Sequence, residues 1–206
     1  MTTSMLKKVN LMHYISGKCK NKSVQNLCKK LSKKLSFKSG KDVENLCHLS
    51  YWLYILGEKE LAKKCINLTA DVPFDQNYNV WDFINNIWGL GIRIFREEGK
   101  NKDAEEIIKK MDKNYLIPRK QFKETTEQIL AHEKKRRSRY DLDESSYHEE
   151  IEECLNDNDI KGANEWRFIA LLSLIGDTET GLYPNLNENK SKIESIIKNY
   201  IGEIIK

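Results

Sequence analysis

The feature that most constrains the fold of this chain is a helical-hairpin pattern that occurs twice, each time around a glycine. In the first copy, an apolar, aromatic-rich stretch ends at Gly57, and a charged stretch containing Ala62 follows. Gly99 and Ala104 take the same places in the second copy. Glycine readily adopts the left-handed conformation that ends a helix, so both patterns predict two helices joined by a short turn. Stacked hairpins of this kind usually present a surface to a partner.

Apolar residues recur along the chain at the spacing of helices, and no stretch alternates as a strand would. We expect a helix over residues 162–176, broken by the segment 176–181, and a last helix over 188–205. Pro118 suits the first turn of a further helix. The sequence therefore predicts an all-α fold of about 8–10 helices, an irregular stack of antiparallel helical hairpins. Residues 1–206 are expected to form a single domain with a lysine-rich segment at its amino terminus.

One helix of this stack, expected from about Val80 to Glu98, is densely apolar. It contains Gly89 and Gly91, and glycine inside a helix weakens it relative to alanine. The two glycines therefore predict the close approach of a neighbouring helix.

The hairpins resemble the tetratricopeptide repeat over residues 43–112. The likeness lies in Trp88-Gly89-Leu90-Gly91 followed by Gly99 and Ala104, and in the turn from Leu56 to Ala62. Gly57 and Gly99 are 42 residues apart, whereas a regular repeat spans about 34 residues. We therefore expect an irregular stack, either a solenoid or a bundle. The resemblance implies protein or peptide binding and brings no catalytic residues with it.

The lysine-, asparagine- and isoleucine-rich composition, the small size and the paired helices are also similar to those of small, all-helical bacterial immunity proteins of polymorphic toxin systems. That resemblance implies a protein that binds and neutralises a cognate toxin. A basic toxin would suit the segment from Asp141 to Asp159, which contains nine acidic residues and no lysine or arginine.

Aromatic residues concentrate on both sides of the polar loop that joins the two hairpins. Tyrosine and tryptophan are common anchors of binding surfaces because they bury a large area and keep a polar tip. Alternatively, each ring could fill the core between helices. The candidate partner-binding residues are Tyr51, Tyr54, Asp75, Asn77, Tyr78 and Trp81.

Charge is distributed unevenly, since residues 1–41 contain eleven lysines and no acidic residue. This asymmetry indicates either a surface for an anionic partner or a solvated face turned toward the chain's own acidic half. Lysines on one helix neutralise phosphates, so nucleic acid is the alternative partner to a protein. The segment has few aromatics, Tyr14 and Phe37, and no arginine for base recognition. The lysines that would bind nucleic acid are Lys29, Lys30, Lys33 and Lys34.

Motifs of catalysis and cofactor binding are missing from the sequence. His132-Glu133 lacks the second histidine of a zinc-protease helix, and there is no phosphate-binding loop or nucleophile elbow. His148 precedes several glutamates that could place carboxylates beside its imidazole, although a solvated acidic face explains them better. We therefore expect a non-enzymatic protein without a catalytic residue, metal or cofactor, and with an oligomeric state that the sequence leaves open.

Cysteine usage and hydropathy favour a cytoplasmic protein. The five cysteines form no Cys-x-x-Cys pair, which favours reduced, packed thiols. No apolar run approaches the ~20 residues of a membrane span, and we expect no membrane partner. The first residues lack the apolar stretch of a signal peptide.

Overall fold

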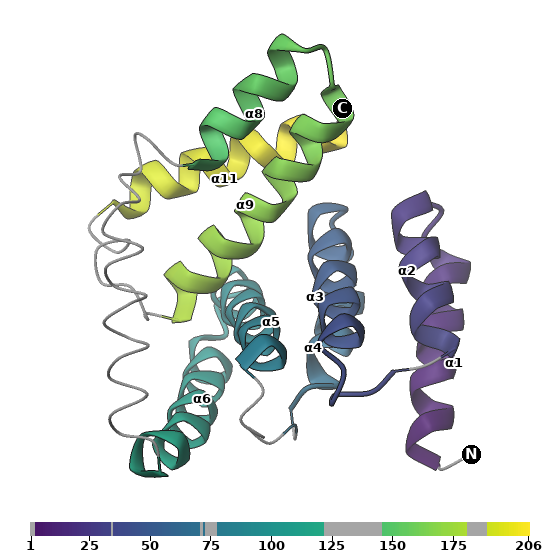
Figure 1. Cartoon of the computed structure of the whole chain (residues 1–206). Helices are drawn as coiled ribbons and strands as arrows, with labels where there is room; N and C mark the ends of the chain where they lie inside the picture. Colours follow the sequence, from purple (N-terminus) through teal and green to yellow (C-terminus); the bar gives the residue numbers. More distant parts are fainter. Residues whose placement is uncertain (1–2, 34, 71, 73–77, 122–145, 181–188) are drawn as a thin grey trace. The chain divides into compact units, whose positions relative to one another are not determined.

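The computed structural model describes residues 3–33, 35–70, 72, 78–121, 146–180 and 189–206, and Figure 1 shows them as coloured ribbons. These ranges contain nine helices and no strand, which confirms the all-α prediction. The chain divides into two compact units, residues 1–107 and 108–206, and each unit is described by itself. The single-domain organisation stays a prediction.

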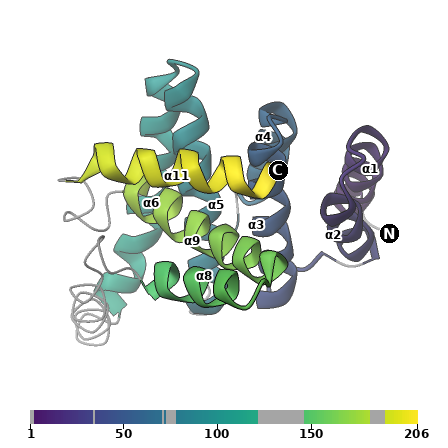
Figure 2. The same cartoon turned by 90° about the horizontal axis from the view of Figure 1, so that it is seen from above.

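The first unit is a row of helices that pack on their neighbours in the sequence. Helix α2 packs against α1 and α3, and α3 also packs against α4 and α5. Figure 2 shows α3 beside both α4 and α5. The helices are α1 (Thr3–Lys18), α2 (Lys22–Lys33), α3 (Gly40–Ile55), α4 (Lys59–Asn67), α5 (Tyr78–Glu97) and the beginning of α6 (Asn101–Gln121). Fully buried core residues of α3 and α5 include Leu46, Leu49, Leu53, Ile87, Leu90 and Ile94.

The second unit contains α8 (Ser146–Asn156), α9 (Ile160–Thr180) and α11 (Lys190–Ile205). Helix α9 packs against both α8 and α11. The core of this unit includes Ile151 of α8, Leu171 and Ile175 of α9, and Ile193 and Ile197 of α11. The prediction that α9 ends at Gly176 is wrong, because this helix continues to Thr180. A single glycine costs only about 1 kcal/mol of helix propensity, and Ile175 and Gly176 are buried in the unit.

Both predicted hairpin turns are confirmed. Gly57 and Gly99 take φ values of +81° and +72°, in the left-handed region that favours glycine. At each turn, two consecutive amides donate to carbonyls three and five residues back, which satisfies carbonyls at the helix end. The bonds are Gly57 N to Tyr54 O (3.0 Å) and Glu58 N to Leu53 O (2.8 Å), then Gly99 N to Arg96 O (3.0 Å) and Lys100 N to Phe95 O (2.8 Å).

A third turn of the same geometry joins α8 to α9, and it was not predicted from the sequence. Asn158 occupies the left-handed position with φ of +58°. Its amide donates to Leu155 O at 3.1 Å, and the Asp159 amide donates to Cys154 O at 2.8 Å. Asparagine is the residue that most often replaces glycine at this position. A residue that favours the left-handed conformation was therefore present in the sequence at this turn, but it was asparagine and not glycine.

An alanine follows each of the three left-handed residues at a distance of five positions. Ala62, Ala104 and Ala163 are all essentially fully buried, at 0%, 1% and 0% exposure. A small residue there lets the second helix of each hairpin lie close to its neighbours. The chain therefore contains one hairpin design three times, at irregular spacing.

Close packing at Gly91 is also confirmed. A Cβ atom at this position would lie 3.1 Å from Ile107 Cδ1 and 3.2 Å from Ile66 Cγ2. These distances are tighter than ordinary contact, so only glycine fits without displacing a neighbour. Pro118, in contrast, does not begin a new helix, because it lies in the last turn of α6. A proline there removes one donor near a helix end, where few helical hydrogen bonds follow it.

Candidate functional site

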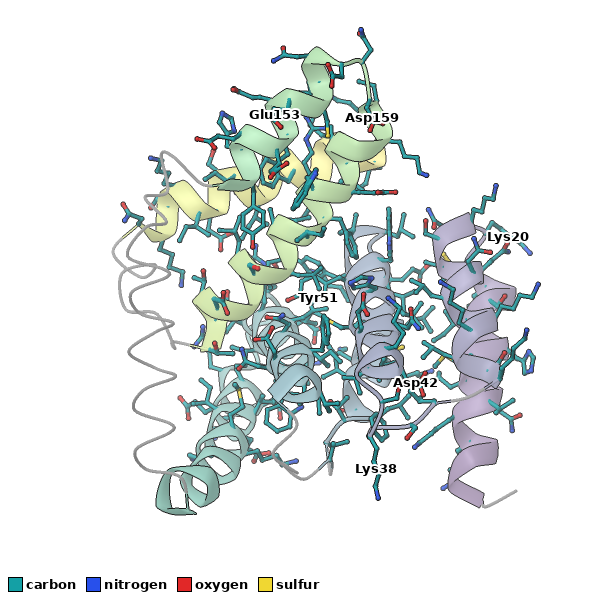
Figure 3. The ribbon with its side chains drawn as sticks, in the orientation of Figure 1. Lys20, Lys38, Asp42, Tyr51, Glu153 and Asp159 are labelled. Atoms are coloured by element: carbon teal, nitrogen blue, oxygen red, sulfur yellow. The ribbon has the colours of Figure 1, made fainter. Side chains whose placement is uncertain are left out.

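The two tyrosines of α3 that were predicted to anchor a partner are buried inside the first unit. Tyr51 is 0% exposed, and its hydroxyl donates to the carbonyl of Asn86 at 3.0 Å. Figure 3 labels Tyr51 at the interior of this unit. Tyr54 is also buried. Neither ring offers surface to a partner, because α5 covers the face of α3 on which they lie.

Tyr54 instead belongs to a charged network between α3 and α5. Its hydroxyl donates to Glu97 Oε1 at 2.7 Å and accepts from Arg93 Nε at 2.7 Å. Arg93 also pairs with Glu97 at 3.0 Å, and Lys59 pairs with Glu97 Oε2 at 2.8 Å. Burial raises the pKa of Tyr54 well above its usual range, against the lowering effect of Arg93. The phenol therefore stays protonated and serves as a structural link.

A second network ties α4 to the end of α5. Lys63 Nζ contacts the Glu98 carboxylate at 2.8 Å and 3.0 Å, and also pairs with Glu60. Burial would lower the pKa of Lys63, but the hydrogen bonds that it donates to these two carboxylates raise it. Hydrogen bonds from Lys100 and Lys63 lower the pKa of Glu98. Every charge in this network is compensated, so it stabilises the hairpin and offers no reactive group.

The side chains of the other four predicted partner-binding residues lie outside the described part of the structure. Asp75 and Asn77 lie outside the described residues. Tyr78 and Trp81 lie in the first turns of α5, and their side chains are outside the described part of the structure.

Most lysines of the amino-terminal hairpin are exposed, and those of α1 and α2 pair with no acidic side chain in the described part of the chain. Among the described residues, the one ion pair of a lysine from residues 1–41 is Lys41 with Glu44, at 2.8 Å. Lys34 lies outside the described residues, and Lys20 is labelled in Figure 3 in the turn between α1 and α2. We define the lysine face as the exposed lysines of α1, α2 and this turn: Lys7, Lys18, Lys20, Lys22, Lys29, Lys30 and Lys33.

Tyr14 lies beside this lysine face and is 46% exposed. Lys18 Nζ of the same helix is 5.5 Å from the centre of its ring, and Lys64 Nζ of α4 is 5.1 Å away. Both distances fall in the range of cation–π attraction. The sequence showed Tyr14 and Lys18 one helical turn apart, but only the tertiary structure brings Lys64 to the ring.

Helix α8 carries the opposite charge. Its exposed carboxylates, together with those of the turn that follows, are Glu149, Glu152, Glu153, Asp157 and Asp159. Figure 3 labels Glu153 and Asp159 on this part of the second unit. His148 pairs with Glu152 at 3.1 Å, and both side chains are more than half exposed. A pair this exposed to water lacks the enclosed environment that acid–base catalysis uses.

Four cysteines are buried: Cys19, Cys28, Cys47 and Cys65. Burial raises the pKa of Cys28 to about 11 and holds that of Cys47 well above its usual range. Thiols in this state are unreactive packing groups. Among the described residues, no three His, Cys, Asp or Glu side chains are placed to hold a metal ion. No helix in the described ranges is long and apolar enough to cross a membrane.

Comparison with known proteins gives a family for the whole chain. The model of a family of unknown function, DUF6707, matches residues 5–206. The chain belongs to the DUF6707 family. No curated protein and no solved structure matches this DUF6707 member.

Proposed function

We propose that this DUF6707 member is a non-enzymatic interaction protein built as an irregular, tetratricopeptide-like stack of helical hairpins. The recurrence of one turn geometry and one buried alanine in three hairpins supports a stacked-hairpin design. Such stacks act by presenting side chains on a rigid surface. The charged networks around Tyr54 and Lys63 support the same proposal, because their groups bind one another.

Of the two predicted classes of partner, nucleic acid has the better support. The observation that carries this proposal is the lysine face, whose seven exposed lysines make no ion pair among the described residues. Lysine is depleted at protein–protein interfaces. A polyanion, in contrast, gains affinity from each lysine through the release of counterions. Unneutralised lysines spread over two helices therefore suit a phosphate backbone better than a protein surface.

Binding of this kind would not depend on base sequence. Residues 1–92 contain no arginine, which is the residue that pairs with guanine through two parallel hydrogen bonds. Lysine acts as a point charge on phosphates, and such contacts position a protein without reading sequence.

Salt titration of the full chain tests this proposal. A labelled oligonucleotide should bind at about 50 mM salt and weaken steeply toward about 200 mM. Replacing Lys29, Lys30 and Lys33 by Gln should lower the slope of log affinity against log salt by about 2 for a single strand. The matched control changes the same charge on another exposed surface, Lys102, Lys109 and Lys110 of α6. An absence of binding by the unmodified chain at low salt would exclude nucleic acid.

Capture of a protein is the second candidate, and an immunity protein that neutralises a toxin is its most specific form. The exposed carboxylates of α8 favour it, because an acidic face would raise the association rate with a basic toxin. A pull-down from the native lysate with nuclease treatment separates the two candidates. A stoichiometric protein that survives nuclease and is lost when Glu149, Glu152 and Glu153 become Gln would favour capture. Nucleic acid released by salt would favour the lysine face.

A further inference from the structure

Tyr14 is unusual among the aromatic residues of the first unit. Among the described side chains of this unit, it is the one large hydrophobic group that is clearly exposed, at 46%. Tyr51 and Tyr54, in contrast, are buried and donate their hydroxyls to partners inside the unit. Nearly half of the Tyr14 residue therefore stays accessible to a ligand.

The surroundings of this ring are positive and come from two helices. Lys18 follows one turn later in α1, and Lys64 reaches the ring from α4. No acidic residue occurs in residues 1–41, and Glu60, one turn before Lys64, pairs with Lys63. Both ammonium groups end flexible four-carbon chains, so they can move from the ring to a nearby anion.

The surface of α1 beside Tyr14 is open at Gly17. Gly17 lies three residues after Tyr14, on the same side of α1, and it is exposed. A Cβ atom at Gly17 would meet nothing within 4 Å. The space above Gly17, on the side of α1 that carries Tyr14, is therefore free of other side chains.

We infer that Tyr14, Lys18 and Lys64 form a subsite for single-stranded nucleic acid, in which the ring stacks on a base and the two ammonium groups bind the flanking phosphates. This inference rests on the proposed nucleic-acid function and names its ligand more closely. A single strand exposes the faces of its bases, whereas a duplex keeps them stacked against one another. Aromatic side chains within a lysine-rich surface are the usual means of binding single strands without sequence preference.

The test compares Tyr14 variants on a single-stranded oligothymidine of about 15 nucleotides and on the corresponding duplex. Tyr14→Leu should weaken binding of the single strand about tenfold. It should leave duplex binding and the salt slope unchanged, since no charge is lost. Tyr14→Phe keeps the ring and should bind as the unmodified chain does. Replacing Lys18 and Lys64 by Gln should lower the single-strand salt slope by about 1.4.

A second pair of variants tests the site without touching the ring. Gly17→Glu places a carboxylate beside Tyr14, where the open space accommodates it, and should weaken single-strand binding. Gly17→Gln has the same size without the charge and should bind more tightly than the Glu variant. Thermal unfolding of each variant checks that the first unit is intact.

The outcomes separate this inference from the proposed function. The subsite is overturned if Tyr14→Leu binds the single strand as tightly as the unmodified chain does. If the variant of Lys29, Lys30 and Lys33 still loses affinity in that case, nucleic-acid binding by the lysine face stays intact. The absence of any binding at low salt would overturn both. The subsite is also overturned if polyglutamate of equal charge competes as strongly as the oligonucleotide, since polyglutamate has no base that could stack on the ring.

Discussion

The hydroxyl of Tyr54 in α3 donates a 2.7 Å hydrogen bond to Glu97 in α5, 43 positions later in the chain. The same oxygen accepts a 2.7 Å hydrogen bond from Arg93, one turn before Glu97. A single phenol thus satisfies a buried guanidinium and a carboxylate of the facing helix. A buried charge such as that of Arg93 is stable only when it has a partner.

Replacing Tyr54 with Phe should therefore destabilise the first unit by about 1–2 kcal/mol, because Arg93 loses an acceptor and Glu97 a donor. The measurement is urea unfolding followed by the fluorescence of Trp52 and Trp88, which lie in α3 and α5. Tyr14→Phe removes a hydroxyl from an exposed ring and should change stability by less than about 0.5 kcal/mol. Equal stability of the two variants would contradict the structural role of Tyr54.

The left-handed turns give a prediction that depends on the backbone alone. Gly57→Ala should cost about 1–2 kcal/mol, because Ala is strained at a φ of +81° although its Cβ would meet no atom within 4 Å. Asn158→Gly should stay within about 0.5 kcal/mol of the unmodified chain, since both residues tolerate this conformation. Asn158→Ala should cost about 1 kcal/mol. Denaturant midpoints measure all three, and a neutral Asn158→Ala would show that the third turn does not need its left-handed residue.

Overpacking tests the buried alanine of the third hairpin. Ala163→Leu should destabilise the second unit by about 1–3 kcal/mol, since the residue has no exposed surface and the larger side chain must displace neighbours. Lys161→Leu adds a similar apolar group two positions earlier, where the side chain is exposed, and should be nearly neutral. Circular dichroism with the fluorescence of Trp166 follows the unfolding of α9. A tolerated Ala163→Leu would argue against close packing at this position.

The lowered pKa of His48 predicts that stability falls in mild acid. Burial lowers its pKa from the ordinary value of 6.5, with Lys41 and Lys30 adding to the effect and Glu44 opposing it. The unfolded chain therefore binds a proton at a pH where the folded chain does not. The contribution of His48 to stability is therefore fully present above pH 6.5, decreases as the pH drops below it, and changes no further below the folded-state pKa of this histidine.

Urea unfolding at about pH 7.5 and about pH 5 measures this loss. His48→Gln should remove the part of the pH dependence that belongs to this histidine. His13→Gln, at an exposed position in α1, is the matched control. An identical pH dependence in the His48 variant and the unmodified chain would refute the prediction.

Local sequence signals predicted the elements well wherever one residue type decides the backbone. Gly57 and Gly99 marked two turns because few other residues accept positive φ. Gly91 was predicted to allow a close approach, and Ile66 and Ile107 lie against it. Asn158 was missed because asparagine serves many other loop roles, so its presence alone does not indicate a helix end.

The candidate site was less predictable because exposure depends on contacts between distant segments. Tyr51 and Tyr54 have the chemistry of surface anchors, but α5 covers both. Tyr14 had no special signal in the sequence beyond its position near lysines. The binding role proposed for Tyr14 depends on Lys64, 50 positions later in the chain. The Lys64 ammonium group lies 5.1 Å from the centre of the Tyr14 ring.

The sequence by itself determined the helical class, two of the three hairpin turns and the lysine-rich, acid-free amino-terminal segment. These properties depend on periodicity, glycine and composition, which act between residues close in the chain. Only the tertiary structure decided which aromatic residues are buried, where α9 ends and which cations surround Tyr14. Those outcomes depend on packing between helices, whose free energy comes from surfaces that meet only after the chain has folded.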